Sequence, residues 1–552
     1  MNIIGTLMLY PEVAQRLAEV SSQPDSLFAH RRIGLEKESL RVNAEGGISQ
    51  TDHPRAFGRA LTNPKITTDF SEALLEMVTP PCNSAQSALD YLTSIHHYVV
   101  RHLPNREMLW NTSMPCILSG ESSVRIAEYG HSHNGRMKNI YRRGLGLRYG
   151  RKMQAIAGIH FNYSMPEAAL KKSASWHQPP PSPSSISAFG QSASMDDATT
   201  SYFHMSRNLL RIGWLVPYLF GSSPAVCHSF VTAEEASGLE IFNDTTLYEP
   251  TGTSLRQGNI GYSYREDDSI DLSVRHDCFR TYIDDLLSHV TTKHPAYDSL
   301  GVVDQHGRYL QLNTNRLQIE NEYYSSVRPK QIPQAGEMPL LAMHRRGIQY
   351  IELRSLDVSP FHSVGLDLMT LQFLELMMMF SFLADSPPLE VSEMSMNGAN
   401  MLAVAHRGRE AGIALATPTG SRKLKEWAAE ILSSMAPIAD YLAQTEGDES
   451  YQQALKNQQA KLADPTLMPS TQVLDSMRQN GSFYSFAQSS STQHHQQLLA
   501  AESDRELLAD IESSVAESEH KFAQMDQQSS DESFARFLAD YFSQLDDRGS
   551  AA

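Results

Sequence analysis

The sequence predicts an α+β protein whose sheet is largely antiparallel. Strand-like alternation occurs at 34–40, 157–166, 309–324 and 348–358, in irregular runs among helical patterns. A doubly wound parallel protein would instead alternate strand and helix regularly. The chain has 552 residues, of which 41% are hydrophobic, so it can bury a large core. This length allows several domains, and equally one elaborated domain with a helical appendix.

The elements follow in order along the chain. Helical patterns at 11–20 and 90–103 flank the first strand, and a Ser- and Pro-rich stretch at 171–200 reads as a surface insertion. After about residue 420 the chain becomes helical and polar. We therefore predict a catalytic domain at 1–420 and a helical region at 421–552.

Two apolar helices are well marked. The segment 366–384 is the most apolar, yet it contains Asp367 and Glu375, which favours a buried helix over a membrane span. Near the C-terminus, Ser529 and Glu532 form a possible capping box before an apolar helical stripe. The stripe consists of Phe534, Phe537, Leu538, Tyr541, Phe542 and Leu545.

Composition predicts a cytoplasmic protein without nucleic-acid or membrane partners. The formal net charge is −17, which disfavours binding to polyanions. The apolar N-terminal run has no basic residue before Arg16, so it lacks the charged start of a signal peptide. The four cysteines are widely scattered, with no C-x-x-C pair and no disulfide-like density, which favours a reducing compartment.

The first strand, "GLEKESL" at 34–40, raises a question of charge. Glu36 and Glu38 project from one face of the strand, and Lys37 and Ser39 from the other. An acidic face is often only the solvated side of a sheet. If the face is buried instead, the two carboxylates repel each other unless a positive charge lies between them.

The same pattern recurs at other strands. In "LQIENE", Glu320 and Glu322 are again two residues apart, and in "YIELRSLD" Glu352 shares a face with Arg354. Between the predicted strands at 34–40 and 157–166 lies "ITTDFSEALLEMVTP", which contains Asp69, Glu72 and Glu76 amid apolar residues. The apolar neighbours Ile33, Leu35, Leu317, Ile319, Ile351 and Leu353 indicate that each strand buries its other face.

Several carboxylates around one cavity indicate a divalent cation. Oxygen ligands suit Mg²⁺ or Mn²⁺, and the chain has no Cys–His cluster of the kind that binds zinc. Mg²⁺ with open coordination positions typically accompanies a phosphate, so phosphoryl transfer is the hypothesis from the residues alone. His160 shares a polar strand face with Asn162 and Ser164; it is either a structural histidine or a further ligand.

Two alternative signals are weak. The glycines at 144, 146 and 150 do not have the G-x-G-x-x-G spacing, and no P-loop sequence is present. From Arg136 to Lys152 the chain carries seven basic residues and no acidic one. This segment either binds phosphates or forms an exposed basic surface.

The motifs taken together resemble the proteobacterial glutamate–cysteine ligases. The resemblance rests on ordered motifs from about residue 30 to 385. They are "GLEKESLRV", "ITTDFSEALLEMVTP", "NTSMPC", "YRRGLGLRYGRKMQAIAGIHFNYSMP", "PYLFGSSPA", "TSLRQGNIGYS", "LQIENEYYSSVRPK" and "GIQYIELRSLDVSPF".

This resemblance implies a glutamine-synthetase-like fold, with a curved, mainly antiparallel sheet forming a funnel that is covered by helices. It implies ATP- and Mg²⁺-dependent joining of the γ-carboxylate of L-glutamate to the amine of L-cysteine, through a γ-glutamyl phosphate. The product, γ-glutamylcysteine, is the first intermediate of glutathione synthesis. Feedback inhibition by glutathione is also implied.

The resemblance also assigns residues. The implied metal ligands are Glu36, Glu38, Asp69, Glu76, His160, Glu322 and Glu352. Arg354 resembles the catalytic arginine near the transferred phosphoryl group, and Arg256 resembles an anchor for substrate or phosphoryl oxygens. The implied cysteine pocket consists of Phe70, Tyr141, Leu145, Gln154, Tyr262 and Tyr324.

Lys37 and Ser39 replace the Arg and Thr that are common in relatives, but both belong to the other strand face.

The alternative enzyme is a related carboxylate–amine ligase with a different amine acceptor. The alternative of another class is a catalytically inactive regulatory homologue, which the retained acidic residues and Arg354 disfavour.

Overall fold

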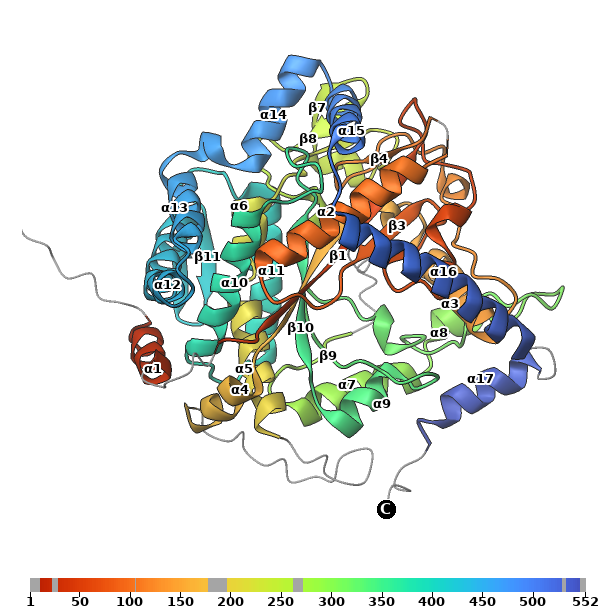
Figure 1. The fold of residues 1–552 in the computed structure, drawn as a ribbon, viewed down its shortest axis with the longest axis horizontal. Coiled ribbons are helices and arrows are strands. Elements are labelled where there is room, and N and C mark those ends of the chain that lie inside the picture. The colour runs from red at the N-terminus through yellow and green to blue at the C-terminus, as the bar shows by residue number, and fades with distance from the viewer. Residues whose placement is uncertain are drawn as a thin grey trace, which may run out of the picture.

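The computed structural model describes residues 10–21, 28–104, 106–176, 196–261, 272–528 and 533–546 (Figure 1). Its strands are β1 (Arg32–Val42), β2 (Ile66–Thr68), β3 (Leu74–Val78), β4 (Met108–Trp110), β5 (Gly158–Ser164), β6 (Ala225–Cys227), β7 (Glu240–Asn243), β8 (Thr246–Tyr248), β9 (Val327–Lys330), β10 (Tyr350–Asp357), β11 (Ala414–Thr417) and β12 (Gly420–Lys423). Its α-helices are α1 (Pro11–Ser21), α2 (Ala85–His102), α3 (His133–Tyr149), α4 (Glu167–Ser173), α5 (Asp197–Ile212), α6 (Leu215–Phe220), α7 (Phe279–Thr291), α8 (Pro295–Leu300), α9 (Pro339–Arg346), α10 (Leu368–Leu383), α11 (Val391–Arg407), α12 (Leu424–Glu446), α13 (Ser450–Ala463), α14 (Pro469–Asn480), α15 (Phe483–Ala500), α16 (Arg505–Gln528) and α17 (Phe534–Ser543).

One sheet organises the molecule. Within the described residues its strand order is β2-β3-β1-β5-β10-β9, with β4 also paired to β1. Every pairing in this sheet is antiparallel. Two smaller antiparallel sheets join β6, β8 and β7, and β11 with β12. The predicted α+β class with a mainly antiparallel sheet is confirmed.

Helices cover one face of this sheet. Helix α10 packs against α5, α2 and β5, and its residues from Leu371 to Leu383 are all buried. A helix that is apolar on all sides must be enclosed in this way, as the sequence predicted. The outer helices α12 and α13 pack on α10, and α16 lies along α2 (Figure 1).

Strand β1 shows why the two sheet faces differ. Ile33 and Leu35 are fully buried against the helices. Lys37 lies on the same face, where its ammonium is 2.5 Å from Ser39 Oγ and 3.1 Å from His96 Nε2 of α2. Burial lowers the pKa of Lys37 to about 7. The intervening residues Glu36 and Glu38 therefore point to the opposite, polar face, as predicted.

The predicted strand at 309–324 is wrong. Residues 320–322 form a short 3-10 helix, η7 (Glu320–Glu322), and the preceding segment is irregular. Side chains replace the ladder hydrogen bonds here: Gln318 Oε1 accepts from the Leu312 amide at 3.0 Å, and Asn313 Nδ2 donates to Gln318 O at 2.9 Å. Polar side chains that bond to their own backbone disfavour a strand.

The predicted insertion at 171–200 is shorter than expected. Helix α4 extends to Ser173, and α5 begins after Asp196, whose side chain accepts from the Thr199 amide at 2.8 Å. Residues 177–195 lie outside the described residues, as do Ser529 and Glu532 of the predicted capping box. Helix α17 is instead capped by Ser533, which accepts from the Arg536 amide at 3.2 Å.

Two of the four scattered cysteines are bonded to each other. Cys116 and Cys227 form a disulfide, with their Cα atoms 5.1 Å apart, and Cys82 and Cys278 are buried thiols. The two bonded residues are separated by 111 positions, so no local pattern could pair them. Among the described residues, no helix is both long and apolar enough to cross a membrane.

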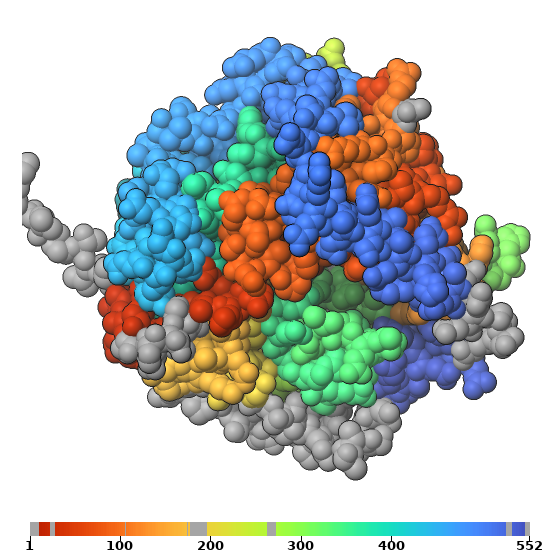
Figure 2. Space-filling model, viewed as in Figure 1, coloured from red at the N-terminus to blue at the C-terminus, as the bar shows by residue number. Residues whose placement is uncertain are grey.

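The C-terminal helices share the main core. One apolar cluster contains residues of the sheet, of α10, of α12 to α15 and of α16. The predicted boundary at residue 420 falls in the hairpin of β11 and β12, and the division into two regions stays a prediction. In Figure 2 the surface is recessed between α16 and the helices α7 and α9.

Candidate active site

Strand register brings the predicted acidic residues together on the polar face of the sheet. Glu36 of β1 is opposite His160 of β5, and Glu38 is opposite Glu76 of β3. On the other side of β5, Glu352 of β10 is opposite Asn162. The acidic residues that lie far apart in the sequence thus meet across four adjacent strands.

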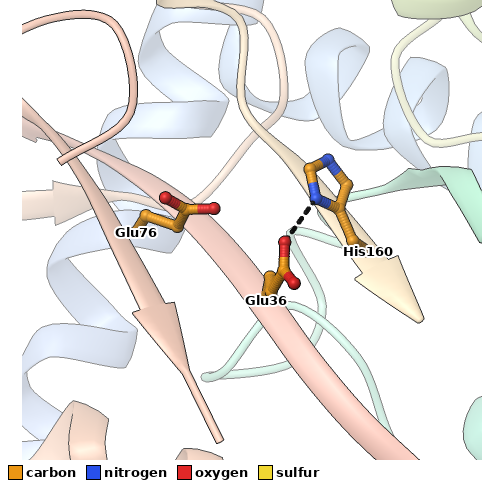
Figure 3. A group of neighbouring side chains, drawn as sticks. All are labelled: Glu36, Glu76 and His160. Atoms are coloured by element: carbon orange, nitrogen blue, oxygen red, sulfur yellow. Dashed lines mark hydrogen bonds and ion pairs between the residues drawn. The ribbon is translucent and has the colours of Figure 1, made fainter. Parts of the chain in front are cut away.

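His160 lies at the centre of this cluster. Its Nδ1 atom is 3.0 Å from Glu36 Oε2 and 3.7 Å from Glu352 Oε1, and its Nε2 atom is 3.6 Å from Glu38 Oε1. Ligand atoms of Glu36, Glu76 and His160 all lie within 4.8 Å of one another (Figure 3). This spacing is compatible with one shared cation.

The pKa values of the acidic residues separate into two groups. Burial would raise the pKa of Glu36, but the hydrogen bond to His160 leaves it lowered. Burial would also raise the pKa of Glu352, but the positive charges of Lys330 and Arg354 outweigh it and hold that pKa well below the usual range. Burial raises the pKa of Glu38.

The largest rise is at Glu76. Burial, together with the carboxylates of Glu36, Asp69 and Glu38, raises its pKa well above the ordinary value. At Glu76, burial and the neighbouring carboxylates therefore outweigh the opposing effect of Arg142. A bound dication would reverse the shifts at Glu76 and Glu38, because it stabilises the ionised carboxylates.

Arg354 faces the cluster from β10. Its Nη1 atom is 3.1 Å from Glu352 Oε2, and the ammonium of Lys330 is 3.7 Å from the same oxygen. The register between β10 and β5 shifts between Leu353 and Leu356, so Arg354 lies at a bulge. Bulges commonly redirect a side chain beside an active site.

Arg256 lies behind Arg354. Its Nη2 atom donates to the carbonyl oxygen of Arg354 at 2.8 Å, and its Nη1 atom is 3.7 Å from Asp357 Oδ1. A Cβ atom at Gly158 would be 1.9 Å from the guanidinium of Arg256. Arg256 is buried and is therefore placed to hold Arg354 in position.

The polar face of the sheet forms the floor of a cavity of about 830 Å³. Most of the predicted site residues line it: Glu36, Asp69, Phe70, Glu76, Tyr141, Leu145, Gln154, His160, Glu352 and Arg354. An adjoining pocket is lined by Tyr141, Leu145, Gln154, Tyr324 and Arg354, among others. Tyr262 lies outside the described residues.

Glu322 is not brought together with the other metal candidates. Its Oε1 atom accepts from Arg148 Nη1 at 2.9 Å and from the Tyr149 hydroxyl at 2.8 Å, and its Oε2 atom accepts from the Gln318 amide at 2.6 Å. The side chains of Arg148 and Glu322 are fully buried. Because residue 322 lies in η7 and not on a strand, the expected common face with the other carboxylates does not exist.

The structure adds basic residues that sequence reasoning did not place in the site. Lys138 and Arg142 of α3 line the cavity, and so do Arg328 and Lys330 of β9. The basic run from 136 to 152 contains Lys138 and Arg142. The sequence alone does not show that these two, four residues apart on one helix, line the cavity while other members of the run face outward. Arg328 and Lys330 were missed because Pro329 between them argues against a strand in the sequence. Proline is tolerated here because β9 is a short edge strand.

Comparison with known proteins identifies the family and the fold. The family model described as glutamate–cysteine ligase matches residues 17–404. The chain belongs to the glutamate–cysteine ligase family. It is 41% identical to the glutamate–cysteine ligase of Alcanivorax borkumensis over 95% of this chain and 98% of the relative, and 44% identical to that of Pseudomonas paraeruginosa over 84% of each.

A solved glutamate–cysteine ligase has the same architecture. The crystal structure from Francisella tularensis, in complex with AMP, superposes with a TM-score of 0.85 at 29% identity. The match covers 94% of this chain and 99% of the other. The predicted ligase class and the predicted family are both confirmed.

Proposed function

We propose that this chain joins the γ-carboxylate of L-glutamate to the amine of L-cysteine at the expense of ATP. The products would be γ-glutamylcysteine, ADP and phosphate, and the reaction would be the first step of glutathione synthesis. The observation that carries this proposal is the cluster of Glu36, Glu76 and His160 in one cavity with Arg354. A carboxylate needs activation because hydroxide is a poor leaving group, and phosphorylation by ATP supplies it.

The donor set fits a hard divalent cation. It is rich in carboxylate oxygens with one imidazole, and the repulsion that raises the pKa of Glu76 would be relieved by positive charge. We propose that Glu36, Glu38, Asp69, Glu76, His160 and Glu352 hold Mg²⁺, with Mn²⁺ as the alternative ion. When bound, the ion reduces the repulsion between the phosphates and the attacking carboxylate.

The basic residues supply fixed positive charge. Arg354 would bind an oxygen of the transferred phosphoryl group by a charge-assisted hydrogen bond, with Lys330 beside it. A guanidinium suits this role because it does not lose its proton at neutral pH. Arg256, through its bond to the Arg354 carbonyl, is a positioning residue in this arrangement.

The adjoining pocket would accept the amine. Tyr141, Leu145, Gln154 and Tyr324 line it directly beside Arg354, and Phe70 lines the neighbouring wall; by resemblance Tyr262 completes it. Its aromatic and aliphatic walls would exclude water, which otherwise hydrolyses an acyl phosphate. A small, half-apolar pocket fits the thiol side chain of L-cysteine.

The direct test is ADP release from ATP, Mg²⁺ and L-glutamate, with and without L-cysteine, combined with the mass of the product. Cysteine-dependent ADP formation and a γ-glutamylcysteine mass support the proposal. Turnover with a different amine only would favour the related carboxylate–amine ligase. Well-folded protein that forms no ADP with any amine would favour the inactive homologue.

Two further proposals follow from this reaction. Glutathione contains the γ-glutamylcysteine moiety, so we propose that it occupies the product site and inhibits by feedback; inhibition that glutamate does not relieve would contradict this.

We also propose a cytoplasmic location, where ATP and both amino acids are available. Recovery of the protein outside the cytoplasmic fraction of lysed cells would contradict it.

A further inference from the structure

Helix α17 forms part of the cavity wall, although it lies far from the sheet in the sequence. Tyr541 of α17 and Met525 of α16 both line the cavity that contains His160 and Arg354. Both helices lie beyond residues 17–404, which the family model covers. Figure 1 shows α17 at the edge of the molecule, beside α3 and α9.

Packing fixes α17 against α3. Phe534 and Leu538 are buried in a cluster with Ile140 of α3, Leu312 and Ile319, as the predicted apolar stripe requires. The guanidinium carbon of Arg136 lies 4.2 Å from the centre of the Phe534 ring.

A second attachment joins the end of α17 to the segment before α9. Gln544 Oε1 accepts from the Met338 amide at 3.3 Å, and Gln544 Nε2 donates to Gly336 O at 3.0 Å. Gly336 itself lines the cavity. The helix is therefore held on both sides by segments that shape the cavity.

The cavity has two chemically different ends. At the sheet, the carboxylates face Arg142, Lys330 and Arg354. On the side of α17, Met137 and Ile319 line the cavity and share a packing cluster with Tyr541, and Pro333, Ala335 and Pro339 of the segment bonded to Gln544 line it too. Glu337 in that segment is paired with Arg346 at 2.7 Å.

Tyr541 presents an uncharged ring to this end. Burial, together with the carboxylate of Glu320, raises the pKa of its phenol above the usual range. The side chain is therefore a neutral, flat aromatic surface at neutral pH.

We propose that Tyr541 forms a wall of the nucleoside subsite and contacts the purine base of ATP. The inference rests on the ligase reaction proposed above. Glutamate and cysteine are small amino acids without a ring, whereas ATP combines a flat uncharged base with a polyanionic chain. The two ends of the cavity match those two parts, with the triphosphate directed toward the basic residues and the base toward α17. Aromatic rings stack on any base because every base has a π-face.

The test compares full-length variants of α17. Tyr541→Ala is expected to raise both the KM for ATP and the Kd for ADP, measured by calorimetry, at least fivefold. The KM values for glutamate and cysteine should stay within twofold. Tyr541→Phe should behave as wild type, because it keeps the ring.

Phe537→Ala is the matched control. Its ring packs 5.3 Å from that of His133 and does not line the cavity, so nucleotide binding should stay within twofold. Tyr541→Leu keeps apolar packing if the alanine variant unfolds, and it should also weaken ADP binding.

Unchanged ADP binding in a folded Tyr541 variant would overturn the proposal. So would an equal loss in Phe537→Ala, which would mean that docking of α17 alone matters, or a rise confined to the KM for cysteine. A wild-type protein that binds ADP but does not ligate glutamate to cysteine would contradict the proposed function, while the ADP measurements would still decide the subsite.

Discussion

At the scale of single residues, the site works through unequal carboxylates. Glu36 and Glu352 have lowered pKa values because basic neighbours stabilise their charge, while Glu76 has a raised one because burial and other acids oppose it. The local environment thus sets which acids are ionised before any ion arrives.

Arg354→Ala should reduce kcat on the order of 100-fold or more, because it removes fixed charge from the site of phosphoryl transfer. Steady-state ADP release would measure the loss, and circular dichroism would confirm the fold. Arg478→Ala is the control, since that exposed side chain pairs only locally with Asp475. Wild-type turnover in the Arg354 variant would refute its assignment.

Glu76→Gln should have opposite effects with and without metal. In EDTA it should be at least as stable as wild type, because one repelling carboxylate is gone. The stabilisation by Mg²⁺, about 2.7 kcal/mol at a concentration of 100 times Kd, should largely disappear. Thermal unfolding in both conditions tests this, with the exposed Glu512→Gln as control; an undiminished Mg²⁺ effect would exclude Glu76 as a ligand.

Sequence alternation predicted much of the site. It placed Glu36 and Glu38 on one face, and it put His160 and Asn162 in a row that now contacts Glu36. It could not place Lys330, whose role depends on pairing with a strand 20 residues later in the chain. Nor could it place Tyr541, because a helical stripe does not reveal which ring faces a cavity.

At the scale of elements, the first residue of β5, Gly158, must lack a side chain. Gly158→Ala would place a Cβ atom 1.9 Å from Arg256, so the guanidinium must move away from the Arg354 carbonyl. We expect a loss of about 2 kcal/mol in the free energy of unfolding and reduced kcat. Urea unfolding measures the first; Gly238→Ala, where no atom lies within 4 Å, should change stability little. Equal stability of the two variants would contradict this account.

The contact between α5 and the segment before α7 should depend on pH. Burial and Arg207 lower the pKa of His276 from 6.5 to about 3, and its Nδ1 atom is 2.8 Å from Ser206 Oγ. The unfolded chain binds a proton below pH 6.5 while the folded chain does not, so stability falls as pH decreases from 6.5 toward 3. At pH 5 this histidine should cost about 2 kcal/mol.

Urea unfolding of wild type and His276→Gln at pH 7.5 and pH 5 would measure this contribution. The variant should lose about 2 kcal/mol less than wild type between the two values, since glutamine does not titrate. Parallel losses in the two proteins would show that His276 is not responsible.

Prediction of the elements succeeded where the apolar pattern extends over many residues. It failed where side-chain hydrogen bonds take the place of strand pairing. The apolar stripe of α2 and the continuous apolar run of α10 were recognised because packing and pattern agree over many residues. The segment at 309–324 has strand-like alternation, but Gln318 and Asn313 satisfy its backbone instead of a partner strand. Whether such a segment pairs with another strand or bonds to its own side chains depends on tertiary contacts, which the sequence of the segment alone does not reveal.

At the scale of the whole molecule, the disulfide links the segment after β4 to β6. Closing a loop of 111 residues restricts the unfolded chain, and reduction should lower the free energy of unfolding by about 2–4 kcal/mol. Unfolding with and without dithiothreitol measures this effect, which should vanish in the Cys116→Ser/Cys227→Ser variant. An equal effect of dithiothreitol on that variant would show that the bond is not its source.

Strand order has a consequence for how the enzyme is made. Strand β1 leaves the ribosome early, yet its neighbour β5 and then β10 follow much later in the chain. At 5–20 residues per second, roughly 15–60 s separate the synthesis of β1 from that of β10. During that interval the nascent polypeptide carries Glu36 and Glu38 without Arg354, and for the first part of it without His160 as well; α17 emerges later than β10. Activity should therefore begin only after β10 has been made, and a nascent chain stalled before β10 should be inactive however well its first strands are folded.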